Sequence, residues 1–371
     1  MSDPVLFDVW SLPDGRKIGH VQLNAEKTLN SLSLEMIDLM APRLNAWLED
    51  DGIVAVFFDA AGDRAFSAGG DIQNLYHDMV EHPGGPCPYC EAFFEREYRL
   101  DHLIQTYPKP TIAWGHGIVM GGGLGLMSGC RYRIGTETTR IAMPEITIGL
   151  FPDAGATVSF SRMERHWSHF LAWTGANING ADAKVVGLVD HLLNHEQKTA
   201  FVDALKGMTG DIDTAISRII ADAESAAGEF PASQLLAHEA LIRSVIDEAF
   251  SNDNPVLGFK EAATRLTGDK WLERAAASFW GGSPITAAII PEQFRIAKDL
   301  SREEMFRLEL IIAVQCARNP EFAEGVRALL IDKDGSPAWL HHMGEVPGSV
   351  VELFLTPPWD EHPMADLAPT A

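Results

Sequence analysis

The sequence predicts an α/β fold: repeated units of strand, small-residue turn and helix, followed by a mostly helical C-terminal region. Three observations support this. Apolar runs of strand length, such as Val54–Phe58, alternate with longer segments of helical spacing in the first half. Small-residue turns at 66–72 and 121–123 stand between a strand and a helix. From residue 196 to 330, nearly every segment has the apolar spacing of a helix. The strands are too short for a large open sheet.

The N-terminal segment predicts two strands, a helix and a buried strand. Val5–Trp10 and Arg16–Leu23 flank a turn at Pro13-Asp14-Gly15. The spacing of apolar residues predicts a helix over Ser33–Leu48, with its first serine at the N-cap. Val54–Phe58 is apolar throughout, as expected for a strand that is covered on both faces.

The rest of the first half continues this alternation. The turn Phe66–Ile72 opens a second helix, and the triple glycine at 121–123 opens another that continues to Leu126. Around them the patterns predict a loop rich in Pro and Gly at His82–Cys90, a helix over Glu91–Thr106, and strands at Thr111–Trp114, Arg131–Ile134 and Arg140–Met143.

The second half predicts helices. One begins at Ser283-Pro284, because proline is tolerated in the first turn of a helix. We expect a core at residues 1–195, a helical region at 196–345 that completes the site, and a poorly ordered tail at 346–371. The other expected helices are Ala200–Leu205, Ile212–Ala221, Leu235–Phe250, Ala262–Leu266, Leu272–Trp280 and Met305–Ala317.

The composition restricts the partners of the protein. The 371 residues are 46% hydrophobic, which is enough for a sizeable core. The 29 Lys and Arg against 52 Asp and Glu give a net charge of −23, which argues against nucleic acid and anionic membranes as partners. A phosphate-bearing substrate would need a local basic patch, and the sequence does not show where that patch would form.

The N-terminal residues MSDPVLFDVW lack the pattern of a signal peptide or a transit peptide, and no apolar run reaches transmembrane length. We therefore expect a soluble cytoplasmic protein. Four cysteines do not make a disulfide scaffold in a chain of this length. Two of them form the motif Cys87-Pro88-Tyr89-Cys90, which leaves three interpretations open. The pattern favours two cysteines in a surface loop over a zinc site with His77 and His82, or a redox pair.

The run from Gly115 to Asp153 concentrates the residues that can carry chemistry. It holds Gly121-Gly122-Gly123, then Glu145 after a proline, then Asp153 after another. A glycine turn that opens a helix leaves N–H groups free to bind negative charge. With two carboxylates, these are the parts needed to polarise a carbonyl and to move a proton or a water beside it.

Five motifs in order resemble the crotonase, or enoyl-CoA hydratase/isomerase, superfamily. They are LNSLSLEM, AFSAGGDI, MGGGLGL, AMPEITIGLFPDAGAT and WTGANINGADAKVVGLVDHLL. The resemblance implies a spiral of strand–turn–helix units that binds an acyl-CoA. It also implies an oxyanion hole for the thioester carbonyl, which by position would use the N–H groups of Ala68 and Gly122.

Further motifs resemble the 3-hydroxyisobutyryl-CoA hydrolase branch of that superfamily. They are EYRL, YPKP, SPIT, FAEGVRALLIDKD and SPAW, and with them the resemblance covers about residues 4 to 340. It implies hydrolysis of a short branched 3-hydroxyacyl-CoA in valine breakdown, without a metal or redox cofactor. The substrate-contacting positions would be Glu97, Gly122, Glu145 and Asp153, with Glu145 and Asp153 catalytic.

Several questions stay open at this point. Glu145 could attack the thioester or deprotonate a water. Asp153 could orient the substrate or only cap a turn, and Glu97 by spacing alone would be a solvated charge. His116 stands where the family more often has Asn or Asp, so the acyl preference is open, and so is assembly into a homo-oligomer.

Two other functions remain as alternatives. Hydratases that resemble this pattern carry a glutamate where this chain has Gly125, which argues against an enoyl-CoA hydratase or isomerase. The presence of Glu145 and Asp153 argues against a non-catalytic scaffold that binds CoA or a partner protein.

Overall fold

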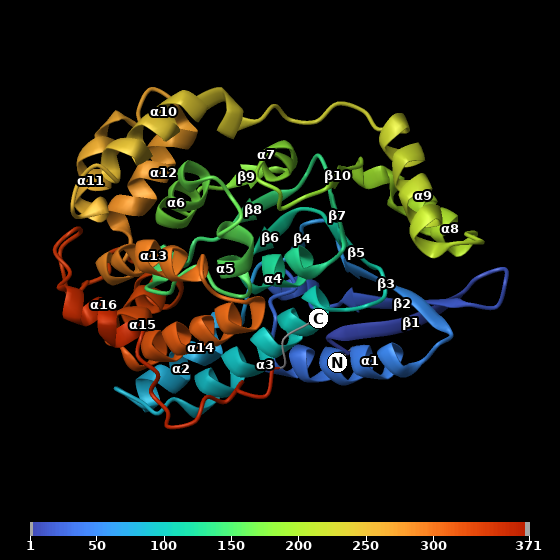
Figure 1. Cartoon of the computed structure of the whole chain (residues 1–371), viewed down its shortest axis with the longest axis horizontal. Helices are drawn as coiled ribbons and strands as arrows, with labels where there is room; N and C mark the ends of the chain where they lie inside the picture. Colours follow the sequence, from blue (N-terminus) through green and yellow to red (C-terminus); the bar gives the residue numbers. More distant parts are fainter. Residues whose placement is uncertain (1–2, 368–371) are drawn as a thin grey trace. The chain divides into compact units, whose positions relative to one another are not determined.

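The computed structural model describes residues 3–367, which form two compact units (Figure 1). The first unit comprises Met1–Gly70, Leu100–Ile141 and Ile178–Ser233. The second comprises Asp71–Arg99, Ala142–Asn177 and Gln234–Ala371. Each unit gathers segments from both sides of residue 195, so this division differs from the three consecutive regions that the sequence led us to expect.

The first unit contains a six-stranded sheet with the order β1-β2-β3-β5-β7-β10. Only the pairing of β1 with β2 is antiparallel, and the other neighbours run parallel. Its core includes Trp10, Phe57, Trp114 and Phe201. The strands are β1 (Val5–Ser11), β2 (Lys17–Leu23), β3 (Ile53–Ala60), β5 (Thr111–Gly115), β7 (Tyr132–Gly135) and β10 (His191–Leu192).

A smaller, four-stranded sheet in the order β4-β6-β8-β9 positions the glycine turns. Its strands are β4 (Ala65–Ser67), β6 (Ile118–Met120), β8 (Arg140–Ala142) and β9 (Ile178–Asn179), and β4 runs parallel to β6. The helices of the first unit are η1 (Glu26–Thr28), α1 (Leu34–Glu49), α4 (Gly122–Gly129), α7 (Gly180–Val185), η3 (His195–Gln197), α8 (Lys198–Lys206) and α9 (Ile212–Ala226). The Ser33 hydroxyl caps α1, as the sequence predicted.

The second unit is built mainly from helices that pack around buried aromatic rings. Trp173 lies 4.7 Å from Phe259 and 5.8 Å from Phe250 between ring centroids. Its elements are α2 (Ile72–Glu81), most of α3 (Pro88–Gln105), η2 (Glu145–Ile148), α5 (Ala156–Phe160), α6 (Arg165–Thr174), α10 (Gln234–Ala249), α11 (Pro255–Ala262), η4 (Ala263–Arg265), α12 (Lys270–Gly281), α13 (Pro284–Ala297), α14 (Arg302–Arg318), α15 (Pro320–Val326), η5 (Arg327–Ile331) and α16 (Gly348–Phe354).

The predicted elements mostly agree with these bounds, with three instructive differences. Helix α3 begins at Pro88 rather than Glu91, because proline fits the first turn, so the last three residues of the expected loop are helical. The short helix expected at Ala262–Leu266 is the end of α11 followed by η4. The expected disordered tail contains α16, and its Met364 is fully buried. Residues 368–371 of that tail lie outside the described residues.

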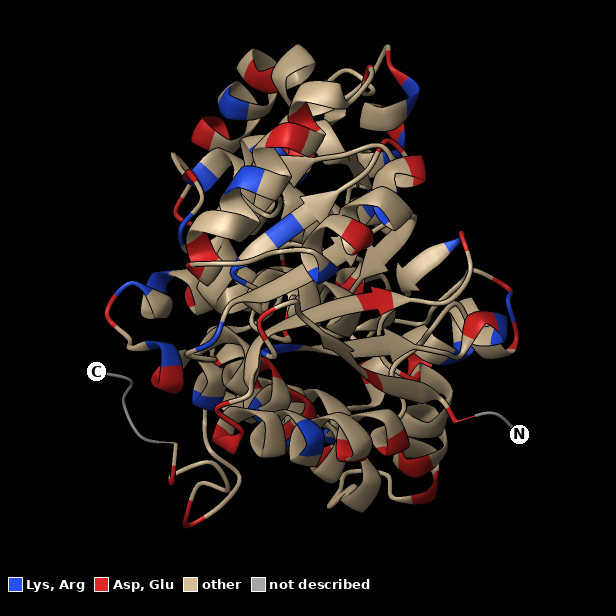
Figure 2. Cartoon of the chain, turned by 90° about the vertical axis from the view of Figure 1, so that its right-hand side faces the viewer, with Lys and Arg blue, Asp and Glu red and all other residues tan. Residues whose placement is uncertain are grey.

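Acidic residues are spread over many helices and loops of the molecule (Figure 2). Among residues 3–367, no helix combines the length and the apolar character that crossing a bilayer requires.

Candidate active site

Two glycine turns of the first unit approach each other closely enough to exclude side chains. One follows β4 and the other follows β6, its parallel neighbour. Gly69 and Gly121 have φ values of +105° and +48°, which favour glycine. A Cβ atom on Gly123 would lie 2.6 Å from the Cβ atom of Ser67, and one on Gly69 would lie 3.3 Å from the Met120 oxygen. The small residues are therefore needed for the two turns to meet.

The backbone N–H of Ala68 is already used within the protein, which corrects its predicted role in the oxyanion hole. It donates to the Leu29 carbonyl at 3.0 Å. The next pairing is a parallel bridge between Leu32 and Gly70, in which the Leu32 N–H donates to the Gly69 carbonyl at 2.8 Å. In a parallel bridge of this kind, Leu32 bonds to the residues before and after Gly70. The N–H of Gly70 itself therefore points away from Leu32. Gly70 is therefore the better candidate donor.

Gly122 is the first residue of α4, where the sequence placed the second donor. The first N–H groups of a helix have no hydrogen-bond acceptor within the helix, because no helical turn precedes them. Leu124 and Gly125 each donate to the Gly121 carbonyl, at 2.8 and 3.1 Å. The buried amide of Gly122 is left at the start of the helix, where the backbone dipoles favour negative charge.

His116 supports the β4 side of these turns, and no chemistry needs to be assigned to it. Its ring is fully buried and stacks on His195, with centroids 4.6 Å apart. The Nε2–H donates to the Gly62 carbonyl at 2.8 Å. Burial lowers the pKa of His116 to about 4, so the ring is neutral at pH 7. The departure from Asn or Asp at this position has a structural explanation.

The second unit brings the predicted carboxylates together in its interior. Glu97 lies on α3, Glu145 begins η2 and Asp153 precedes α5; at most 6% of each residue is exposed. Burial raises the pKa of Glu97 and Glu145 well above the ordinary range, and the charge of Asp153 raises both further. Burial also raises the pKa of Asp153 to about 7. The solvated position that spacing alone favoured for Glu97 is therefore wrong.

Two of these carboxyl groups have an oxygen that lacks a protein partner. Glu97 Oε1 and Glu145 Oε2 are buried without a hydrogen bond to any described residue. A buried oxygen without a partner costs about 1–3 kcal/mol, so its presence calls for a bound group. These oxygens are the atoms of the cluster that are available to a ligand.

Tyr98, which the sequence analysis missed, holds Asp153. The Tyr98 hydroxyl donates to Asp153 Oδ2 at 2.6 Å within the buried cluster. This hydrogen bond favours the ionised form of Asp153 and so opposes the effect of burial on its pKa. Tyr98 directly follows Glu97, but nothing local distinguishes it from a core tyrosine.

The turn that carries Asp153 is fixed by two further side chains that the sequence analysis also missed. Glu309 on α14 accepts hydrogen bonds from the N–H groups of Gly155 and Thr157, at 2.8 and 2.7 Å. Gln293 on α13 donates to the Pro152 carbonyl and to the Thr157 hydroxyl, both at 2.8 Å. Burial raises the pKa of Glu309 to about 8. The C-terminal helices thus hold the turn in one conformation.

The motif Cys87-Pro88-Tyr89-Cys90 is part of the core, which corrects the favoured surface-loop interpretation. Both thiols are fully buried. Cys87 donates to the Ala317 carbonyl at 3.5 Å and Cys90 to the Leu75 carbonyl at 3.4 Å. Burial raises the pKa of Cys87 to about 11, which makes it a poor nucleophile. Within residues 3–367, no group of three or more His, Cys, Asp or Glu side chains is arranged to hold a metal.

Known proteins are similar to this chain in sequence, and a solved structure is similar to it in fold. A 3-hydroxyisobutyryl-CoA hydrolase, mitochondrial, from Danio rerio is 33% identical over 326 residues, which cover 87% of this chain and 82% of that protein. The small ribosomal subunit protein mS47 of Neurospora crassa is also 33% identical, over 86% of this chain and 65% of that protein. The crystal structure of a carnitinyl-CoA dehydratase from Mycobacterium thermoresistibile superposes with a TM-score of 0.84 at 33% identity, covering 98% of this chain and 99% of that one.

The family model described as enoyl-CoA hydratase/isomerase matches residues 18–355, which is most of the chain. The predicted α/β fold and the predicted resemblance to the crotonase superfamily are confirmed. The chain belongs to the enoyl-CoA hydratase/isomerase family.

Proposed function

We propose that the protein hydrolyses a short branched 3-hydroxyacyl-CoA, with 3-hydroxyisobutyryl-CoA as the preferred substrate and 3-hydroxyisobutyrate and CoA as products. The observation that carries the proposal is the buried Glu145. Its Oε2 has no hydrogen-bond partner among the described residues, and the charge of Asp153 raises its pKa. The name of the Danio rerio relative supports the substrate. Gly125, at a position where hydratases of this pattern have a glutamate, supports hydrolysis over hydration.

In the proposed reaction, backbone amides bind the thioester oxygen. The N–H groups of Gly70 and Gly122 would stabilise the negative charge that develops on this oxygen in the tetrahedral intermediate. Loss of one such donor costs about 3 kcal/mol of transition-state stabilisation in other acyl-transfer enzymes. Ala68 would take no part in this step, because its N–H donates a hydrogen bond to the Leu29 carbonyl.

Glu145 can act in either of two ways. As a nucleophile, its ionised oxygen attacks the thioester carbon, the C–S bond breaks, and CoA leaves as a thiolate that takes up a proton. Water then opens the mixed anhydride and restores the carboxylate. As a general base, Glu145 takes a proton from a water that attacks the same carbon. Asp153 would orient the substrate hydroxyl or exchange the proton.

A trapping experiment separates these two routes. Borohydride added during turnover reduces a mixed anhydride, so the nucleophilic route leaves an alcohol in place of the Glu145 carboxyl group. Peptide mass spectrometry would locate this change. Under the general-base route, the Glu145 peptide keeps its mass, and turnover with borohydride is as fast as turnover without it.

The proposed function itself is tested by thiol release from a panel of short acyl-CoAs, each offered with and without a 3-hydroxyl group. We expect the highest kcat/KM for 3-hydroxyisobutyryl-CoA. Crotonyl-CoA is the control for the hydratase alternative: fast loss of its enoyl absorbance without thiol release would contradict hydrolysis. A panel in which no substrate releases thiol would also contradict it.

One comparison favours a second function, association with a ribosome. The mS47 protein of Neurospora crassa is as similar in identity as the hydrolase. A scaffold of this kind would leave Glu145 without a catalytic task. Co-sedimentation of the full chain with ribosomal small subunits, compared with thiol release from the same preparation, distinguishes the two functions.

We place the proposed hydrolase in the cytoplasm, in valine breakdown.

A further inference from the structure

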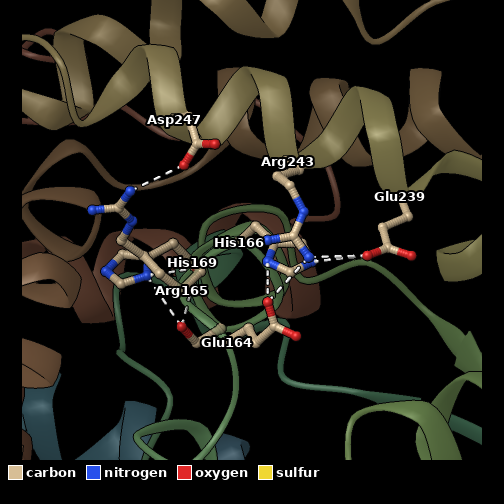
Figure 3. A network of polar contacts seen from close by, with 8 residues as sticks. Glu164, Arg165, His166, His169, Glu239, Arg243 and Asp247 are labelled. Carbon is tan, nitrogen blue, oxygen red and sulfur yellow. Dashed lines mark hydrogen bonds and ion pairs between the residues drawn. The ribbon is translucent and has the colours of Figure 1, made fainter.

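The helical unit contains a cavity of about 360 Å3 that none of the candidate active-site residues lines. It lies where α6 meets the end of α10 and the helix α13, beside the polar contacts drawn in Figure 3. We call it the α6–α13 cavity. Its lining residues are Phe160, Ser161, Met163, Arg165, Ser168, His169, Phe250, Pro255, Pro291, Glu292, Phe294, Arg295 and Lys298.

Aromatic rings form the apolar part of this cavity. The rings of Phe160 and Phe294 lie 6.0 Å apart between centroids. The ring of His169 meets Phe250 at 83° and Phe294 at 88°, with centroids 4.6 and 5.3 Å apart. A planar aromatic ligand could pack against these rings in the same edge-to-face geometry. The volume is in the range of pockets that hold small molecules.

His169 offers the cavity a hydrogen-bond acceptor. Its Nδ1 lies 3.0 Å from the Arg165 carbonyl, which can only accept, so Nδ1 carries the proton (Figure 3). The residue is 6% exposed, and burial lowers the pKa of the ring to about 4, so the ring is neutral at pH 7. Among residues 3–367 no group donates to Nε2, and this atom is not enclosed by protein. The lone pair of Nε2 can therefore accept a hydrogen bond from an N–H or O–H group of a ligand.

Three cations line the same cavity, in a chain whose net charge is −23. Arg165 pairs with Asp247 at 3.0 Å and also lies 4.8 Å from the centroid of the Phe250 ring. Arg295 pairs with Glu292, the acidic lining residue, at 2.8 Å. Lys298 has no ion pair with any residue in the range 3–367. The cavity therefore keeps a positive charge that is available to an anion.

We propose that the α6–α13 cavity binds a planar aromatic anion that carries a hydrogen-bond donor. The aromatic ring would pack among Phe160, Phe250 and Phe294, the anionic group would face Lys298, and the donor would bind Nε2 of His169. This site would be separate from the proposed thioester chemistry, because none of Glu97, Glu145 and Asp153 lines the cavity.

Titration calorimetry with 4-hydroxybenzoate tests the proposal, because this compound has the ring, the charge and the donor. We expect saturable one-to-one binding to the full chain. Benzoate lacks the donor and phenol lacks the charge, so each should bind about tenfold more weakly. Absence of saturable binding up to about 10 mM would overturn the proposal.

Three variants sharpen this test. Lys298→Met should weaken 4-hydroxybenzoate about tenfold, whereas the matched control Lys270→Met, on an exposed position of α12, should bind like the wild type. His169→Phe should remove the preference for 4-hydroxybenzoate over benzoate. Thiol release should stay at the wild-type rate in Lys298→Met, which shows that this variant is folded. Unchanged 4-hydroxybenzoate affinity in Lys298→Met would contradict the site.

Discussion

The two units of the protein build their candidate sites from different materials. In the first unit the proposed chemistry would use backbone amides, and the glycines matter because they leave room for the two turns to meet. In the second unit it would use buried carboxyl groups, and neighbours position them: Tyr98 donates to Asp153, and Glu309 holds the turn that follows Asp153. A backbone site is thus sensitive to added atoms, whereas a carboxylate site is sensitive to lost partners. The following variants test this difference.

The largest effect is expected from a single methyl group in the glycine turns. In Gly123→Ala, the new Cβ would lie 2.6 Å from the Ser67 Cβ and 2.7 Å from the Ser67 backbone oxygen, so the turns must separate. We expect thiol release to fall about 10²–10³-fold, because an oxyanion donor moves out of place. The control is Gly281→Ala at the end of α12, where a Cβ would meet nothing within 4 Å. Equal activity in the two variants would contradict the requirement for close approach.

The next effect concerns the partner of Asp153. Tyr98→Phe removes the O–H that donates to Asp153 Oδ2 at 2.6 Å. We expect kcat/KM to fall about 10–100-fold and the pKa of Asp153 to rise, since the hydrogen bond favours the carboxylate. The acidic limb of the pH–rate profile should therefore move from about 7 to higher pH. A limb that stays in place would show that Asp153 does not need this hydrogen bond.

A smaller effect on stability should follow from Glu309. The pKa of Glu309 is raised from 4.5 to about 8 in the folded state, so the folded protein binds more protons than the unfolded chain in this window. Its contribution to the free energy of unfolding is thus fully present below about pH 4.5 and is lost as the pH rises toward 8.

Glu309→Gln tests this pH dependence. The variant should show a smaller fall of the thermal midpoint between pH 5 and pH 8 than the wild type. It should also lose about 1–3 kcal/mol at pH 5, because the amide cannot accept both the Gly155 and the Thr157 N–H. Thermal unfolding followed by circular dichroism measures both, and parallel pH curves for the two proteins would contradict the assignment.

The smallest effect is expected for Cys87. Its thiol is buried and donates to a backbone carbonyl, so Cys87→Ala should cost about 1 kcal/mol of stability and leave thiol release from acyl-CoA unchanged. Treatment of the wild type with a strong chelator should likewise leave the unfolding midpoint unchanged. A large loss of stability on chelation would revive the zinc interpretation.

The sequence predicted the parts of the site that are local. The strand–turn–helix pattern, the triple glycine and the positions of Glu145 and Asp153 are short motifs, and the fold that they predicted is confirmed. The proposed amide donor depends on a pairing between Leu32 and Gly70, which are far apart in the chain, whereas the family resemblance, carried over by position, implied Ala68.

The supporting residues could not be predicted for the same reason. Glu309 and Gln293 lie more than a hundred positions from the turn that they hold, and on their helices they look like ordinary polar residues. Cys87 and Cys90 likewise gain their burial from α2 and α14. Long-range packing decides which polar side chain is a support and which is solvated, and periodicity alone does not contain that information.

The most direct measurement is thiol release from 3-hydroxyisobutyryl-CoA by the wild type and by Glu145→Gln, which keeps the shape of the side chain and removes its charge. The proposed mechanism predicts fast release by the wild type and a loss of at least about 10³-fold in the variant, with substrate affinity nearly unchanged. A variant that releases thiol within tenfold of the wild-type rate would contradict the role of Glu145.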